Sequence, residues 1–156
     1  MSRILFGLFT AAVQKTNIYL VLDLTDLVYL DYDPTTGVLY ARWPDNSPLM
    51  VQYFEESFEA VLLAIKTYEV KYLLLDSSRN RNSLSPEHYL HIFTLLFSGL
   101  AQTPLQKMAR LKSSFEGIES KFRHYNHEII EGIGIHFQVA NFEWREEAIA
   151  WLLADE

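Results

Sequence analysis

The sequence contains no cysteine. Disulfide bonds, thiolate metal sites and cysteine nucleophiles are therefore excluded, and a reducing cytoplasm is compatible with this composition. The chain also lacks a long apolar run, since its longest falls far short of the roughly 20 residues that a membrane-spanning helix needs. It has no Gly-x-Ser-x-Gly, glycine-rich phosphate loop or His-Glu-x-x-His motif. We therefore expect a cytoplasmic protein without a membrane span, a cofactor or enzymatic activity.

Basic residues are few relative to acidic ones. The 13 Lys and Arg are outnumbered by 20 Asp and Glu, and the formal net charge is −7. Such a chain repels phosphate backbones, so nucleic acid is not an expected partner. By contrast, 49% of the 156 residues are apolar, which is enough to build the core of one folded domain.

One domain over residues 25–156 is expected, because no linker, repeat or low-complexity tract divides the chain. The apolar stretch within residues 1–24 fits an N-terminal arm or an extra strand. The same stretch has features of a secretory signal, and a third interpretation is an arm that reaches onto a second subunit.

The most informative segment begins with the apolar residues 73–75, which stop abruptly at Asp76. A polar loop follows over 77–83, and Ser85 and Pro86 then open a helix as its N-cap and first residue. A strand buried on both faces reads as an unbroken apolar stretch. Its loop emerges at the carboxyl edge of the sheet, where ligands and partners bind.

Apolar periodicity and turn residues predict the other elements. The expected strands are 18–23, 27–32, 38–43, 70–75, 105–111 and 133–140, with a turn over 33–37. The first expected helix has its apolar stripe over 54–68, and Ser47-Pro48 can start it, or it starts a few residues later. The others are 86–100, one that opens with a capping box between Ser113 and Glu116 and stops at Gly132, and one capped by Asn141. This order predicts an α/β fold with a mixed, mostly parallel sheet of four to six strands, an N-terminal antiparallel hairpin and four helices.

The helix expected over 86–100 is apolar around most of its circumference. A helix of this kind is buried on more than one side, either by other helices or by a second subunit. Together with the apolar N-terminal stretch, this pattern suggests a homodimer.

A few short motifs carry a resemblance to a known family. They are a strand ending in Trp43, a strand ending in Asp76, a helix opened by Ser85-Pro86-Glu87, and Trp151-Leu152 near the end. In this order the chain resembles the STAS fold of sulfate transporters and anti-sigma factor antagonists, the SpoIIAA-like group, over about residues 27–153. It is most similar to a set of bacterial STAS/SEC14-like proteins.

The antagonists of this family carry the motif Asp-Ser-Ser-Gly-Leu-Gly, in which a serine is phosphorylated by a partner kinase. Asp76-Ser77-Ser78 matches the first half of that motif, whereas the residues from Arg79 onward depart from the second half. The resemblance implies a non-catalytic regulatory or protein-interaction module with a protein partner. The alternative that it implies is a small-molecule or lipid-binding domain, which would need an apolar cavity of roughly 300 Å³ or more.

The candidate binding site is the loop that follows residue 75. It consists of Asp76, Ser77, Ser78, Arg79, Arg81 and Ser83. Its hydroxyl and guanidinium groups can hold an anion at the start of the next helix, or an arginine can pair with a phosphate on Ser78 or Ser83. The alternative is a solvated loop in which Asp76 and Ser85 only cap backbone groups.

Two pairs of histidines have helical spacing, His88 with His91 and His124 with His127. A metal site needs three or four converging ligands, and neither pair supplies them alone. We expect surface histidines and no metal.

Overall fold

The computed structural model describes residues 18–21, 28–43, 54–80 and 84–155. Within them, the strands of one sheet are β1 (Ile18–Val21), β2 (Tyr29–Asp33), β3 (Val38–Arg42), β4 (Tyr72–Asp76), β5 (Lys107–Leu111) and β6 (Gln138–Phe142). The described helices are α2 (Phe54–Tyr68), α3 (Pro86–Leu100), α4 (Glu116–Ile133) and α5 (Arg145–Leu153). Residues 1–17 of the expected N-terminal arm lie outside the described residues.

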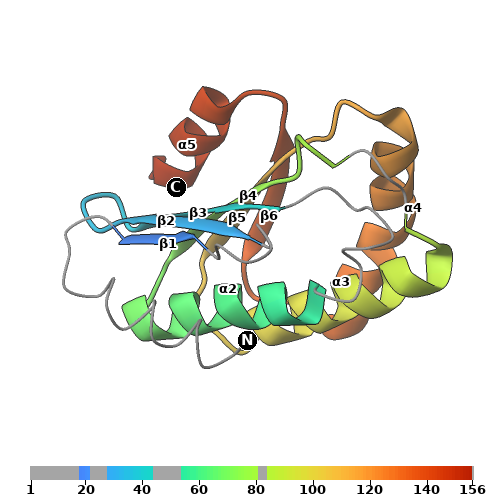
Figure 1. Ribbon diagram of the computed structural model, residues 1–156, viewed down its shortest axis with the longest axis horizontal. Coiled ribbons are helices and arrows are strands. Elements are labelled where there is room, and N and C mark those ends of the chain that lie inside the picture. The colour runs from blue at the N-terminus through green and yellow to red at the C-terminus, as the bar shows by residue number, and fades with distance from the viewer. Residues whose placement is uncertain (1–17, 22–27, 44–53, 81–83, 156) are drawn as a thin grey trace.

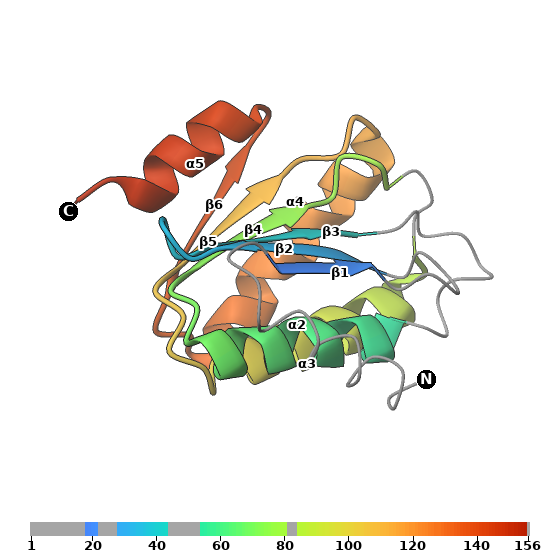
Figure 2. The ribbon, with the colours of Figure 1, turned by 60° about the vertical axis from the view of Figure 1, so that its left-hand side comes forward.

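The sheet is mixed, with strand order β1-β2-β3-β4-β5-β6. β2 pairs antiparallel with both β1 and β3, whereas β3, β4, β5 and β6 run parallel (Figure 2). In the parallel part Leu74 pairs with Ala109, and Ala109 pairs with Ala140. The predicted fold class is confirmed: α/β, with a mostly parallel sheet, an antiparallel hairpin near the N-terminus and four described helices.

Helices cover both faces of the sheet (Figure 1). α2, α3 and α4 pack on one face and α5 packs on the other. Consecutive side chains of β4 alternate between these layers, so Leu73 and Leu75 enter the core under α2–α4 while Leu74 enters the core under α5. Coverage on both faces is the reason that this strand reads as an unbroken apolar stretch.

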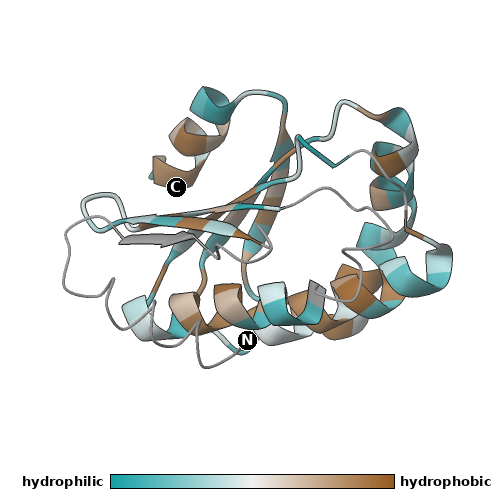
Figure 3. Ribbon diagram, in the orientation of Figure 1, coloured by the Kyte–Doolittle hydropathy of each residue, from teal (hydrophilic) through white to brown (hydrophobic). Residues whose placement is uncertain are grey.

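α3 is the central helix of its layer and packs between α2 and α4. Apolar residues recur along it (Figure 3), and Leu96, Phe97 and Leu100 are fully buried. The expected burial by other helices is found, since α2 and α4 of the same chain flank α3, but one face of the helix stays exposed. Two of its leucines, Leu90 and Leu95, remain 37% and 43% exposed.

The hairpin between β2 and β3 closes with the turn predicted from its residues. Gly37 adopts a φ of 75°, a left-handed conformation that glycine reaches without a steric penalty. Its amide donates to the Asp33 carbonyl at 2.8 Å. The Asp33 side chain also accepts from the Thr35 amide at 2.9 Å, as expected of an aspartate that begins a turn.

α4 ends later than predicted, and the strand expected over 133–140 is wrong for its first five residues. The helix continues through Gly132 to Ile133, and the left-handed residue that terminates it is Gly134, with a φ of 71°. β6 begins only at Gln138. The apolar residues at 133, 135 and 137 do alternate, but that spacing also fits the end of a helix and a short connection packed on the core.

Two predicted helix caps are wrong as well. α4 has Phe115 at its N-cap position without a side-chain cap, and α5 has Trp144 there. Asn141 lies inside β6. Ser113 lies two residues before Phe115, and its hydroxyl accepts from the Phe115 amide at 3.1 Å, ahead of the helix. The predicted cap of α3 is confirmed, because the Ser85 Oγ accepts from the His88 amide at 3.2 Å.

The corrected end of α4 predicts opposite effects for two neighbouring glycines. Gly132→Ala should raise the free energy of unfolding by up to about 1 kcal/mol, because Gly132 is helical, exposed and has open space at its Cβ position. Gly134→Ala should lower it by about 1–2 kcal/mol, because alanine is strained at a left-handed φ. Urea unfolding of both variants checks this, and equal effects of the two would contradict the assigned end.

Candidate functional site

The carboxyl ends of the parallel strands bring the predicted site residues to one edge of the sheet, but not into one cluster. Asp76 and Ser77 are buried, at 7% and 4% exposure, whereas Ser78 and Arg79 are exposed to solvent. Arg81 and Ser83 lie outside the described residues. Asp76 and Ser77 therefore have a structural role, and Ser78 and Arg79 are the two that a ligand or partner can reach.

Asp76 holds the loop from the α5 side of the sheet. Its Oδ2 accepts from the Tyr40 hydroxyl of β3, and its Oδ1 accepts from the Ser78 amide at 2.9 Å. The Trp43 amide donates to the Asp76 carbonyl at 3.0 Å. The interpretation that Asp76 caps a backbone group is therefore confirmed. Its contact with Tyr40 is one that the sequence did not reveal.

The environment of Tyr40 keeps its hydroxyl protonated. Burial and the neighbouring Asp76 raise the pKa of Tyr40 well above its ordinary value. The Arg145 guanidinium lies 4.4 Å from the centre of the Tyr40 ring and acts in the opposite direction with a smaller effect. The hydroxyl thus stays a donor to the Asp76 carboxylate.

Further hydrogen bonds hold residues 77–80 through their backbone groups. The Ser77 amide donates to the Leu111 carbonyl at 3.2 Å, and the Asn80 amide donates to the Ser77 carbonyl at 3.0 Å. The Ser113 hydroxyl then donates to the Asn80 carbonyl at 2.6 Å. These bonds join the loop after β4 to the segment after β5.

The strongest feature of this edge is a buried ion pair that sequence reasoning missed. Arg110 of β5 is 2% exposed and donates from both terminal nitrogens to Glu119 of α4, at 2.9 and 2.8 Å. Its guanidinium also lies 3.9 Å from the centre of the Phe122 ring. The available signal was Arg110 itself, because a cation inside a covered strand must be paired.

Glu119 also corrects the predicted capping box. The Ser113 amide donates to Glu119 Oε1 at 2.6 Å, so the glutamate that reaches back to this serine is Glu119. The expected partner, Glu116, instead pairs with Arg123 on the exposed side of α4.

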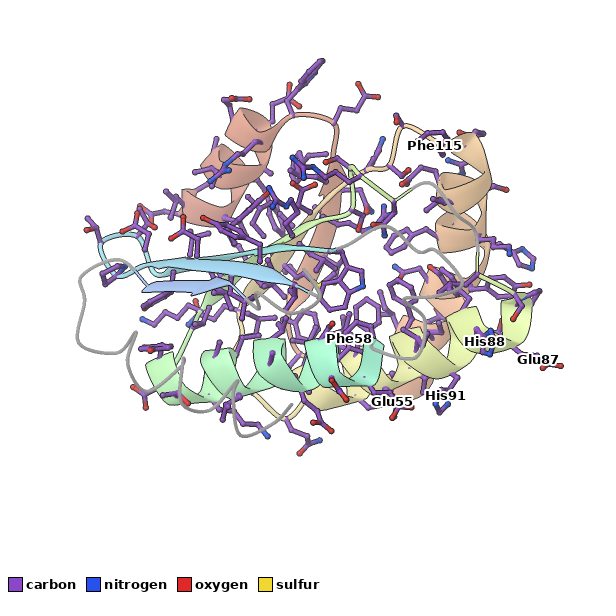
Figure 4. The ribbon with its side chains drawn as sticks, viewed as in Figure 1. Glu55, Phe58, Glu87, His88, His91 and Phe115 are labelled. Atoms are coloured by element: carbon purple, nitrogen blue, oxygen red, sulfur yellow. The ribbon has the colours of Figure 1, made fainter. Side chains whose placement is uncertain are left out.

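Two small cavities lie beneath the loop, with volumes of about 10 Å³ and about 20 Å³. Both are lined by Ser77, Asn80, Leu84 and Phe93. Phe58, which points from α2 into the molecule (Figure 4), lines the smaller one. Cavities of this size have room for about one water molecule each. They give no support to a lipid or small-molecule pocket of roughly 300 Å³.

Exposed side chains follow three neighbouring parallel strands at the same edge. Arg79 follows β4, Phe115 follows β5 and Trp144 follows β6. The two aromatic residues are 41% and 63% exposed, and Figure 4 places Phe115 on the outside of the molecule at the start of α4. The sequence predicted the loop after β4 but not the two aromatic positions.

One histidine of each predicted pair contacts a glutamate. His91 Nε2 lies 3.2 Å from Glu55 Oε1, and both side chains are exposed (Figure 4). His127 Nε2 lies 3.1 Å from Glu131 Oε1. In the part of the chain that the structure describes, no three histidine, aspartate or glutamate side chains converge as metal ligands would.

Comparisons with known proteins return no relative. No protein-family model matches the chain, and neither a curated protein nor a solved structure does. The resemblance to the STAS family therefore stays a prediction. Among the described residues, none of the helices has the length and apolarity to cross a membrane.

The two ion pairs of α4 should differ sharply in their contributions to stability. Glu119→Ala should lower the free energy of unfolding by about 3–5 kcal/mol, because it leaves the Arg110 charge buried and unpaired. Glu116→Ala on the same helix should lower it by no more than about 1 kcal/mol, because its pair with Arg123 is solvated. Urea unfolding of both variants measures this, and similar losses would refute the structural role of the buried pair.

Tyr40→Phe should change the free energy of unfolding at neutral and at alkaline pH. Near pH 7 we expect a loss of about 1–3 kcal/mol of unfolding free energy, because the Asp76 carboxylate loses a buried donor. Because the raised pKa favours the neutral phenol in the folded state, the wild-type protein should lose stability as pH rises above about 10. The variant should lose less, and equal slopes in unfolding measurements between about pH 9 and 11 would speak against this environment.

Proposed function

We propose that the protein is a non-catalytic, cytoplasmic regulatory module of the STAS-like type, which binds a protein partner at the carboxyl edge of its sheet. The observation that carries this proposal is the exposure of Arg79, Phe115 and Trp144 on three successive strand exits. Arginine and large aromatic residues supply most of the binding energy in protein interfaces. Loops at this edge are also where open α/β sheets place their binding residues.

The hydrogen bonds of residues 76–80, at the start of the loop after β4, support a binding role over a merely solvated connection. Tyr40 fixes Asp76 on the α5 face of the sheet, and the Leu111 carbonyl of β5 fixes the Ser77 amide, so Ser78 and Arg79 are presented on an ordered support. A preorganised surface loses less conformational entropy when a partner binds. Ser78 is exposed and Ser77 is buried, so Ser78 is the serine of this pair that a partner kinase could reach.

The second part of the proposal is a homodimer through α3. Leu90 and Leu95 are the apolar side chains of this helix that its neighbours α2 and α4 leave more than one third exposed. A twofold contact would place these leucines against their copies in the partner subunit. This contact lies on the helix layer, so it leaves the carboxyl edge accessible.

Photocrosslinking in the cells that normally make the protein tests both contacts. A photoreactive phenylalanine replaces Arg79, Leu95 or Gln102, where Gln102 is an exposed control at the opposite end of the strands. We expect a heterologous adduct from position 79, a self-adduct from position 95 and neither from position 102.

Trp144→Ala should lower the adduct yield at position 79 at least about tenfold, as loss of a hot-spot tryptophan does. The matched control is Leu153→Ala, because Leu153 is also exposed and lies at the far end of α5. An adduct at 79 that Trp144→Ala leaves unchanged, or one that appears equally at 102, would rule out the proposed partner surface. A monomer at tens of micromolar in light scattering would rule out the dimer.

A further inference from the structure

The larger of the two cavities is lined by three residues that each carry a buried polar atom without a partner in the described residues. Asn80 Oδ1, the Tyr89 hydroxyl and Arg110 Nε each lack a hydrogen bond there. Their residues are 5%, 4% and 2% exposed, and all three line the same cavity of about 20 Å³. Buried polar atoms in folded proteins are almost always paired, with protein or with ordered water.

The hydrogen bonds around this cavity connect Asn80, Ser113, Glu119 and Arg110 in a chain. No direct hydrogen bond connects Arg110 back to Asn80. Ser113 connects to Asn80 through its hydroxyl and to Glu119 through its amide. Glu119 connects to Arg110 through both terminal guanidinium nitrogens. Asn80 and Arg110 both line the cavity, and their remaining atoms, Arg110 Nε and Asn80 Oδ1, are a donor and an acceptor.

We propose that this cavity is a binding site for one neutral hydroxylic molecule, which is water in the resting protein. It accepts a hydrogen bond from Arg110 Nε–H, donates one to Asn80 Oδ1 and shares a third with the Tyr89 hydroxyl. Three bonds are typical of a buried water, and about 20 Å³ has room for one.

The charges and hydrogen-bonding groups around the cavity exclude an anion or a cation as its occupant. The Arg110 charge is already balanced by Glu119, and an anion would place its lone pairs against Asn80 Oδ1. A cation would meet Arg110 and also the ammonium of Lys121, which lines the cavity and donates to the Leu84 carbonyl. A hydroxyl both donates and accepts without a net charge, so it can accept from Arg110 Nε–H and donate to Asn80 Oδ1.

Such a water ties the loop after β4 to the buried ion pair. Asn80 is two residues from Ser78, and Arg110 and Glu119 join β5 to α4. Displacement of the water would leave the loop connected to this network through Ser113. The water site is independent of the partner contact proposed above, so either can fail without the other.

A crystal structure of the full chain that shows ordered solvent tests the site directly. We expect an oxygen peak within about 3.2 Å of both Arg110 Nε and Asn80 Oδ1. A cavity without such a peak, or a direct hydrogen bond between these two side chains, would overturn the proposal.

A double-mutant cycle provides an energetic test that does not need crystals. Asn80→Leu and Tyr89→Phe each remove one water ligand, and the two side chains share no direct hydrogen bond. If one water joins them, the unfolding constant of the double variant should differ from the product of the single effects by at least about threefold. Additive effects would overturn the bridge. Gln102→Leu, which changes an exposed amide, is the control and should be additive with Tyr89→Phe.

Discussion

The buried pair between Arg110 and Glu119 is the interaction on which the carboxyl edge depends. It joins the central part of the sheet to α4, and through Ser113 it also fixes the loop after β4. Two charges in an apolar interior are tolerable only when they pair with each other. The pair therefore imposes one relative position on β5, α4 and the loop, where apolar packing alone would allow several.

On the α5 face of the sheet, a hydrogen bond between Tyr40 and Asp76 also joins the start of the loop to the sheet. Asp76 is anchored by the Tyr40 hydroxyl and turns back to the Ser78 amide. Residues 76–80 are consequently held by bonds to β3, to β5 and to Ser113, and Ser78 and Arg79 are exposed to solvent. Arg79, Phe115 and Trp144 are exposed at the same edge of the sheet.

Some parts of the fold could be predicted because their cause is local. The turn closed by Gly37 needs a left-handed residue at that position, and the start of α3 needs the Ser85 hydroxyl to accept an amide. The end of α4 could not be assigned in the same way, because Gly132 and Gly134 both look like stops in the sequence. Which of them ends the helix depends on how far Ile133 can still pack against the core.

The candidate site was predicted only in part for a related physical reason. An apolar stretch that ends at Asp76 marks a strand exit whatever its neighbours are, so the loop could be placed at the sheet edge. The partners of Arg110 and Asp76 come from nine and 36 positions away along the chain, and no local pattern encodes such distances.

The sequence by itself determined the fold class, the strand exits and the absence of thiol chemistry, because periodicity and composition act over a few residues at a time. Only the tertiary structure decided which polar residues are buried, which of them meet, and that Phe115 and Trp144 share an edge with Arg79. Burial and pairing are properties of surfaces that come together only when distant segments pack.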